Sequence, residues 1–340
     1  MRFERLGTTG VYVSRLALGT MTFGGAGTPP WSTIGALDLP AADKLLGTAL
    51  DHGVNLIDTA DMYAGGESES MLGELLGSRR DEVVLATKLA ARMGPGPNQT
   101  GLSRLHLMNA LEASLRRLRT DHIDLYQIHS FDPLTPIEET LTALDDAVRQ
   151  GKVRYIGASN LAAWQLAKAL GVADRRGLTR FVASQSYYSL AGRDIEAELV
   201  PLLAEENVGL IVYSPLAGGF LSGKFGRSGG TDANARRSKA DLPPIDKERT
   251  YDTIDVLRDV AGRHGAAVAQ VALAWVLTRP AVTSVIVGAR RPEQLTDNLG
   301  ALDVELTAED LARLDAASRP PLGYPGWVQA DIASWRLPVG

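Results

Sequence analysis

Short runs of β-branched and apolar residues alternate with longer helix-type runs from about residue 15 to residue 302. Such alternation is typical of a parallel sheet whose strands are joined by crossover helices. Eight strands and no independent linker favour an α/β fold of the (β/α)8 TIM-barrel type, although a doubly wound sheet would alternate in the same way. We expect the strands at Arg15–Leu18, Val54–Ile57, Glu82–Ala86, Ile123–Gln127, Val153–Ile156, Phe181–Ala183, Val208–Tyr213 and Ser284–Val287.

The runs between these strands repeat apolar residues at the helical period of 3.6, for example over 108–118 and 137–148. The second of these helices has a clear start signal. We expect Thr135 to be its N-cap, Pro136 to be its first residue, and Glu138 to complete a capping box.

The chain outside the strands and helices predicts an N-terminal β-hairpin, long loops and extra C-terminal helices on a single domain spanning residues 1–340. Phe3–Leu6 and Val11–Ser14 flank a Gly-Thr-Thr-Gly turn, which predicts the hairpin. Long insertions at Gly24–Pro40, Ala91–Ser103 and Ala217–Arg249 each follow a strand, so we expect them at the C-terminal face of the barrel. The third is polar and is interpreted as a mobile lid. The tail, about 319–340, fits either a surface-packed terminus or an aromatic wall over the active site.

Composition excludes several classes of protein. An apolar fraction of 45% and a charged fraction of 22% argue against disorder. The net charge of −5 and the scattered arginine doublets give no nucleic-acid footprint. Without cysteine, no disulfide framework and no cysteine metal site is expected; we expect no metal, and the cytoplasm is the expected compartment. The N-terminus lacks a signal-peptide pattern, and the longest apolar stretch, Ala266–Leu277, is far short of the roughly 20 residues of a membrane span.

Four residues with reactive side chains lie at or just after the ends of three neighbouring predicted strands. They are Asp58, Tyr63, Lys88 and His129. Barrel enzymes carry their reactive groups at the carboxyl ends of strands. Each residue alone has an ordinary explanation, such as a turn, a loop aromatic or a strand-end histidine. Together they fit a proton donor and the groups that tune it.

A tyrosine hydroxyl, with an ordinary pKa of about 10, is a usable acid near neutral pH. A neighbouring ammonium group would lower that pKa and ease deprotonation in the reverse direction, which suits Lys88 beside Tyr63. A buried lysine needs a carboxylate to stay charged, and Asp58 fits that need. His129 is expected to orient a carbonyl oxygen by a hydrogen bond.

No side chain donates hydride, so reduction would require a cofactor. No convincing Rossmann fingerprint or P-loop appears in the sequence. The later strands instead end in polar and glycine-rich segments. Near the last strand, Gly288 and Arg290 precede a helix begun by Pro292, so a phosphate would meet a guanidinium and a helix N-terminus.

These segments resemble the aldo-keto reductase family from the hairpin to the helix after the eighth strand. The matching motifs are 57–69 (IDTADMYAGGESE), 85–88 (LATK), 124–129 (DLYQIH), 151–160 (GKVRYIGASN) and 213–216 (YSPL). By this resemblance Asp58, Tyr63, Lys88 and His129 match the catalytic tetrad, and the cofactor is NADP(H). The resemblance assigns cofactor binding to Gly19, Thr20, Met21, Asp58, Ser159, Asn160, Gln185, Tyr213, Ser214, Pro215, Leu216, Gly218, Lys224, Gly288, Arg290, Gln294 and Asn298.

The resemblance implies NADPH-dependent, reversible reduction of a small-molecule aldehyde or ketone, with Tyr63 as the proton donor. Trp31, Tyr63, His129 and Trp327 are expected to line the substrate pocket, which suits aryl aldehydes or stacked sugars. Alternatives are a nucleotide-deoxysugar ketoreductase and a cofactor-sensing regulatory subunit resembling potassium-channel beta subunits. A lyase that forms a Schiff base on Lys88 would lack a use for the cofactor segments. The sequence leaves the oligomeric state open.

Overall fold

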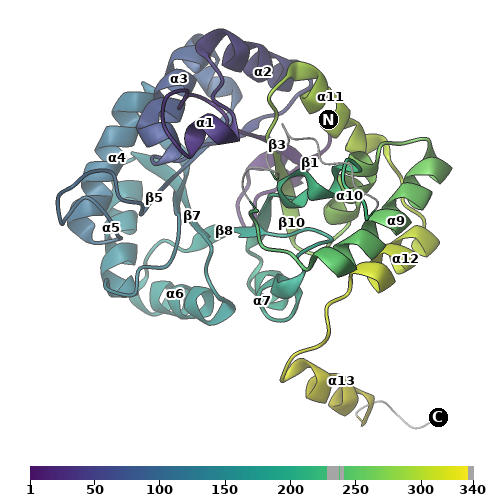
Figure 1. The fold of residues 1–340 in the computed structure, drawn as a ribbon. Coiled ribbons are helices and arrows are strands. Elements are labelled where there is room, and N and C mark those ends of the chain that lie inside the picture. The colour runs from purple at the N-terminus through teal and green to yellow at the C-terminus, as the bar shows by residue number, and fades with distance from the viewer. Residues whose placement is uncertain (228–236, 238–240, 336–340) are drawn as a thin grey trace.

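The computed structural model describes residues 1–227, 237 and 241–335. Parallel strands close into a barrel in the order β10-β3-β4-β5-β6-β7-β8-β9, surrounded by helices (Figure 1). The barrel strands are β3 (Leu16–Gly19), β4 (Leu56–Asp58), β5 (Val84–Leu89), β6 (Ile123–Ile128), β7 (Val153–Ser159), β8 (Phe181–Tyr187), β9 (Gly209–Tyr213) and β10 (Val282–Val287). The predicted (β/α)8 barrel is confirmed, and each predicted strand is present.

The helices of the described residues fill the connections between strands and the C-terminal segment. They are α1 (Trp31–Ile34), α2 (Leu39–Asp51), α3 (Glu67–Leu76), α4 (Arg104–Leu118), α5 (Ile137–Arg149), α6 (Ala163–Arg176), α7 (Leu199–Glu206), α9 (Lys247–His264), α10 (Val268–Leu277), α11 (Pro292–Leu299), α12 (Ala308–Ser318) and α13 (Gly326–Trp335). No single helix in the described ranges is long and apolar enough to cross a bilayer; α9 and α10 pass that test only as a pair bent by 97°.

The three long insertions follow β3, β5 and β9, so they lie at the carboxyl ends of the strands, as predicted. The first carries α1, and the third begins with the 3-10 segment η4 (Ala217–Ser222). Residues 228–236 and 238–240 of the third insertion are not described, so the predicted lid lies largely outside the described residues.

Several strands run further than their apolar residues predicted. β7 was expected to end at Ile156 but continues to Ser159, and β8 was expected to end at Ala183 but continues to Tyr187. Ser159 pairs with Gln185 in the parallel register of these two strands. The ladder therefore continues into polar residues, because backbone pairing does not depend on an apolar side chain.

Two apolar layers stabilise the barrel, one inside it and one between the strands and the helices. The predicted hairpin is present as β1 (Phe3–Arg5) and β2 (Tyr12–Ser14). Leu6, directly after β1, and Val13 of β2 are fully buried and belong to the inner layer. The hairpin therefore packs on the interior core of the barrel.

The start of α5 differs from the prediction. Pro136, rather than Thr135, is the N-cap residue, and it makes no side-chain capping bond. The Thr135 hydroxyl instead donates to Asp132 Oδ2 at 2.7 Å. This charge-assisted bond holds Thr135 in the loop with Asp132, one residue before the N-cap, and the predicted capping box with Glu138 is not formed.

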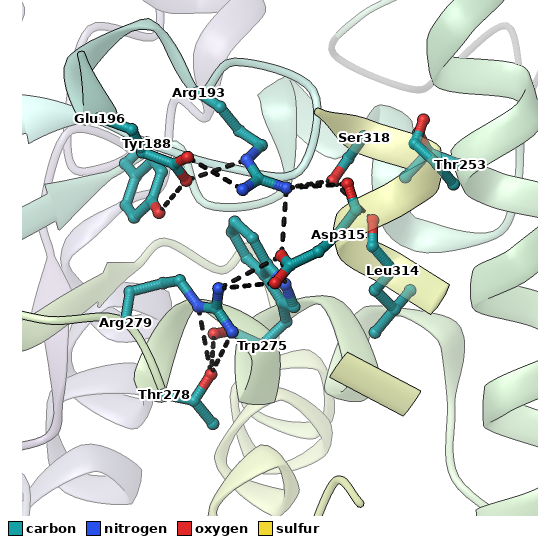
Figure 2. Close-up of polar contacts among 11 residues, drawn as sticks. Tyr188, Arg193, Glu196, Thr253, Trp275, Thr278, Arg279, Leu314, Asp315 and Ser318 are labelled. Atoms are coloured by element: carbon teal, nitrogen blue, oxygen red, sulfur yellow. Dashed lines mark hydrogen bonds and ion pairs between the residues drawn. The ribbon is translucent and has the colours of Figure 1, made fainter. Parts of the chain in front are cut away.

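A buried polar cluster fixes α12 against the barrel (Figure 2). Asp315 of α12 accepts hydrogen bonds from Trp275 Nε1 at 3.0 Å, Arg193 at 3.1 Å and Arg279 at 3.2 Å. Both guanidinium groups also lie over the Trp275 ring, 4.9 and 4.4 Å from its centroid. The Arg193 guanidinium further donates to Ser318 Oγ at 2.7 Å, so α12 is held to its last residue.

Candidate active site

Asp58 and Lys88 form a buried ion pair at the carboxyl ends of β4 and β5. The Asp58 carbonyl accepts from the Thr20 N–H at 2.9 Å, which fixes the end of β4 against β3. Lys88 Nζ donates to Asp58 Oδ1 at 2.5 Å and to the Thr59 carbonyl at 2.8 Å. Burial opposes the charge of Lys88, but Asp58 and then Tyr63 outweigh it and raise its pKa. Lys88 is therefore a buried cation held by one carboxylate.

A left-handed turn presents Tyr63 to this ion pair. Tyr63 begins the 3-10 segment η1 (Tyr63–Gly66), in which Ala64 and Gly65 have φ of 52° and 66°. Lys88 Nζ lies 3.4 Å from the Tyr63 hydroxyl and 5.1 Å from the centroid of its ring. The phenol and the ammonium are thus in hydrogen-bond contact, which gives a proton a direct route between them.

His129 directly follows β6 and faces Tyr63. The centroids of their rings are 6.0 Å apart, and the ring planes meet at 78°. The His129 N–H donates to the Leu89 carbonyl at 2.7 Å, and the His129 carbonyl accepts from Asn160 Nδ2 at 3.0 Å. Burial, and then the charge of Lys88, lowers the pKa of His129 to about 3. The imidazole is therefore neutral near pH 7, and its Nδ1 has no hydrogen-bond partner among the described residues.

Asn160 links these groups to other residues that the sequence assigned to cofactor binding. Its side chain donates to Ser159 Oγ at 3.1 Å and accepts from the Tyr213 hydroxyl at 2.9 Å. The Ser159 hydroxyl donates to the Gln185 carbonyl at 3.0 Å. Gln185 Nε2 donates in turn to Asp58 Oδ2 at 2.8 Å. A chain of hydrogen bonds, which passes through the Gln185 residue, therefore runs from Tyr213 to Asp58 and joins cofactor residues to the predicted catalytic residues.

The other predicted cofactor residues lie at or after the ends of β3, β9 and β10. They are Gly19, Thr20, Met21, Ser214, Pro215, Leu216, Gly218, Lys224, Gly288, Arg290, Gln294 and Asn298. Gly218 has a φ of 67°, and a Cβ there would lie 2.5 Å from the Leu242 carbonyl, so this turn requires glycine. The Arg290 guanidinium donates to the carbonyls of Thr33 and Ile34, each at 2.9 Å. Arg290 is thus held against the loop that follows β3.

The two tryptophans predicted to line the substrate pocket have different positions. Trp31 of α1 lies beside Tyr63, with ring centroids 5.9 Å apart. Trp327 lies on α13, which extends away from the barrel, and is 55% exposed (Figure 1). The structure therefore does not bring Trp327 to the site. The segment between α12 and α13 is rich in proline and glycine. Its composition predicts a turn or loop but not the direction in which α13 leaves the barrel.

Two further residues of the site were not among the predicted ones. Gln127 Nε2 lies 3.4 Å from Asp58 Oδ2, and its position two residues before His129 could have placed it on the same face of the strand. Arg237 is buried and donates to the Ala217 carbonyl at 2.9 Å. Its Nε has no hydrogen-bond partner within the described ranges. Nothing in the polar insertion around Arg237 signals this burial.

Asp61 is a third residue that the sequence did not single out. It is fully buried, and neither carboxylate oxygen has a hydrogen-bond partner in the described part of the chain. Burial first, and the negative charge of Glu69 second, raise the pKa of Asp61 to about 7.

Among the described residues, no group of three or more His, Cys, Asp or Glu side chains is placed so that it could hold a metal ion.

Comparison with known proteins gives concordant matches over most of the chain. The sequence model of the Aldo/keto reductase family matches residues 15–319. An uncharacterized oxidoreductase of Bacillus subtilis, YrpG, is 40% identical over 93% of this chain and 95% of its own length. A probable voltage-gated potassium channel subunit beta of Arabidopsis thaliana is 37% identical, covering 89% and 92% of the two chains. An aryl-alcohol dehydrogenase of Pestalotiopsis microspora is 37% identical, covering 93% and 81%.

Proposed function

This chain belongs to the aldo/keto reductase family, and from that premise we propose that it is an NADPH-dependent reductase of aldehydes or ketones with Tyr63 as its proton donor. The observation that carries the proposal is the position of Lys88 Nζ, which lies 2.5 Å from Asp58 Oδ1 and 3.4 Å from the Tyr63 hydroxyl. A phenol in contact with a buried ammonium is equipped to give up a proton and to regain it.

In the proposed reaction the Tyr63 hydroxyl protonates the carbonyl oxygen as the carbonyl carbon accepts hydride. The negative charge left on Tyr63 is stabilised by Lys88, whose own charge is balanced by Asp58. In the reverse direction the same pair accepts the proton of the alcohol.

His129 orients the substrate in this proposal. A neutral imidazole donates a hydrogen bond from the nitrogen that carries its proton, and it adds no second positive charge beside Lys88. The ring of His129 faces Tyr63, so a carbonyl oxygen bound between them would accept from both side chains. Trp31, on the other side of Tyr63, would bound the same space.

The donor groups of the site fit a nicotinamide dinucleotide. Ser159, Asn160 and Gln185 offer the hydroxyl and amide groups that complement a carboxamide, and Tyr213 offers a ring face. The Arg237 guanidinium lies beside the backbone of Gly218 and pairs with Asp241 at 2.8 Å, while its Nε has no hydrogen-bond partner among the described residues. These groups suit a pyrophosphate. When bound, the cofactor supplies the hydride.

Arg290 is proposed to select NADPH over NADH, because a 2′-phosphate gives its guanidinium a charged partner. We expect Arg290→Met to weaken NADPH binding about tenfold to a hundredfold, as for the loss of a hydrogen bond between charged groups. The dissociation constant for NADH should stay nearly unchanged. Titration calorimetry with both cofactors measures the two constants.

Arg291→Met is the matched control, because Arg291 is an exposed neighbour that precedes the first residue of α11. The measurement with NADH also distinguishes two possible roles of Arg290, which are binding of the 2′-phosphate and support of the loop after β3. An equal loss of NADH and NADPH affinity in Arg290→Met would show that Arg290 acts only by holding the loop at Thr33 and Ile34. The proposed selectivity would then be contradicted.

The function is tested by supplying a panel of aryl, alkyl and sugar carbonyls together with NADPH or NADH. We expect carbonyl-dependent oxidation of NADPH, followed by loss of absorbance of the reduced nicotinamide, with NADPH preferred. The aryl members are the first choice because one relative is named an aryl-alcohol dehydrogenase. Absence of turnover with every carbonyl would contradict the proposal.

The potassium-channel relative supports a second candidate, a regulatory subunit that senses its cofactor. That candidate shares the cofactor site with the first but predicts slow turnover. The same panel distinguishes the two, because tight NADPH binding without appreciable carbonyl reduction would favour the regulatory role.

A further inference from the structure

Exposed large apolar side chains of the described residues lie on the N-terminal hairpin, in the C-terminal segment and in segments that follow barrel strands. Between residues 20 and 318, the large apolar side chains that are exposed in the described residues are Leu105, Leu134, Trp164 and Leu242. Each lies in a segment that follows the carboxyl end of a strand. Single exposed apolar residues are ordinary on protein surfaces, whereas apolar side chains in contact with one another beside a candidate active site point to a ligand.

Phe131 and Leu134 lie in the loop that follows His129, and the Phe131 ring packs against Trp164 of α6; we call these three side chains the distal patch. The rings of Phe131 and Trp164 lie 5.9 Å apart, at an angle of 63°. Trp164 is 60% exposed and Leu134 is 92% exposed. The patch therefore offers an aromatic pair and an aliphatic side chain to a ligand.

The distal patch is tied to the catalytic groups through the backbone. Phe131 is two residues beyond His129, so their Cα atoms are at most about 7 Å apart. Trp164 is the second residue of α6, four residues after Asn160, and Asn160 Nδ2 donates to the His129 carbonyl at 3.0 Å. Tyr63, His129, Phe131 and Trp164 thus follow one another around the rim of the barrel.

Hydrogen bonds fix the loop that carries the patch. Asp132 accepts from the Leu102 N–H and the Thr135 hydroxyl through Oδ2, and from the Leu134 N–H through Oδ1, at 2.7 to 2.9 Å. The carboxylate next to the patch is therefore already satisfied by donors of the protein. An uncharged ligand suits this surface better than a cationic one.

We propose that the distal patch is a specificity subsite that binds the aromatic end of an elongated aryl carbonyl substrate whose C=O group lies between Tyr63 and His129. This inference rests on the proposed carbonyl reductase function. Tryptophan and phenylalanine rings favour offset or edge-on contact with another ring, and a contact of this kind adds to the stabilisation from buried area.

The test compares two substrates that share one reacting group. Benzaldehyde reaches Tyr63 and His129 only, whereas 4-(benzyloxy)benzaldehyde carries a second ring towards the distal patch. For Trp164→Ala we expect the ratio of kcat/KM for the long over the short substrate to fall about five- to tenfold, as for loss of an aromatic contact. Trp164→Phe should retain most of the ratio, and kcat/KM for benzaldehyde should stay within about twofold.

Trp335→Ala is the matched control, because Trp335 is 76% exposed on α13 and lies outside the barrel. Leu134→Ala is a second test variant, and its almost fully exposed side chain makes misfolding of that variant no concern. An unchanged ratio in both Trp164→Ala and Leu134→Ala would overturn the subsite. Failure of the wild-type protein to prefer the longer substrate, or to reduce it at all, would also overturn the subsite. Only the absence of turnover with every carbonyl of the panel would overturn the proposed function as well.

Discussion

Replacing Tyr63 with phenylalanine is expected to lower kcat by about 10²- to 10⁴-fold, the range typical for loss of a general acid. The substitution removes one hydroxyl and leaves the ring between Trp31 and His129. Affinity for NADPH should change little, because the hydrogen-bonded chain from Tyr213 to Asp58 does not include Tyr63. Steady-state turnover and cofactor titration of the same sample measure both quantities.

Tyr12→Phe is the control for this substitution, since Tyr12 is 61% exposed on the hairpin and lies outside the candidate site. Its turnover should equal that of the wild-type protein. Retained turnover in Tyr63→Phe, or loss of NADPH binding with residual turnover, would contradict the role of Tyr63 as proton donor.

The sequence predicted the barrel because a barrel repeats one local unit. Each strand of that unit carries apolar residues, and each following helix has a 3.6-residue period, so errors of two or three residues at a boundary do not change the topology. The sequence did not reveal the polar ends of β7 and β8. Ser159 and Gln185 lie inside strands although their own character suggests a loop.

The sequence predicted the parts of the candidate site that depend on the type of residue at a strand end. It did not predict the parts that depend on the path of a loop. Lys88 and Asp58 attract one another wherever the barrel brings β4 beside β5, so their pairing follows from the fold. Trp327 depends instead on the path of a proline- and glycine-rich segment, which no local pattern determines. Arg237 and Asp61 depend on burial by distant segments, and sequence periodicity does not report such burial.

The ionised form of Asp61, which prevails at high pH, destabilises the folded state. Its carboxyl group is fully buried beside Tyr126, which is also buried and whose hydroxyl has no hydrogen-bond partner among the described residues. The charged groups that act on Asp61 are Glu69, Arg117 and Lys88, and burial outweighs the attraction of the two cations. The Arg117 side chain is also committed to Glu69, at 2.7 Å. Asp61 therefore carries a proton in the folded state up to a pH of about 7.

The pH dependence of stability follows from this raised pKa. Because the folded state holds the proton more tightly than the unfolded state, Asp61 contributes stability that is complete below pH 3.8 and is lost as the pH rises to about 7. The contribution is on the order of 4 kcal/mol, of which about 3 kcal/mol is lost between about pH 5 and pH 8. Asp61→Asn removes the charge, so the stability of the variant relative to the wild-type protein should rise by about 3 kcal/mol over that interval.

Denaturant unfolding of both proteins at pH 5 and pH 8 measures this change, and Asp145→Asn is the control of opposite sign. Burial of Asp145 is outweighed by Arg149 and Thr179, which hold its pKa below 3.8. Asp145 is thus ionised in both states throughout this interval, so its variant should be destabilised by a nearly constant amount. If the difference in unfolding free energy between Asp61→Asn and the wild-type protein were the same at pH 5 and pH 8, the buried, protonated state of Asp61 would be contradicted. If that difference grows between pH 5 and pH 8, ionisation of the carboxyl group of Asp61, two residues before Tyr63, destabilises the barrel.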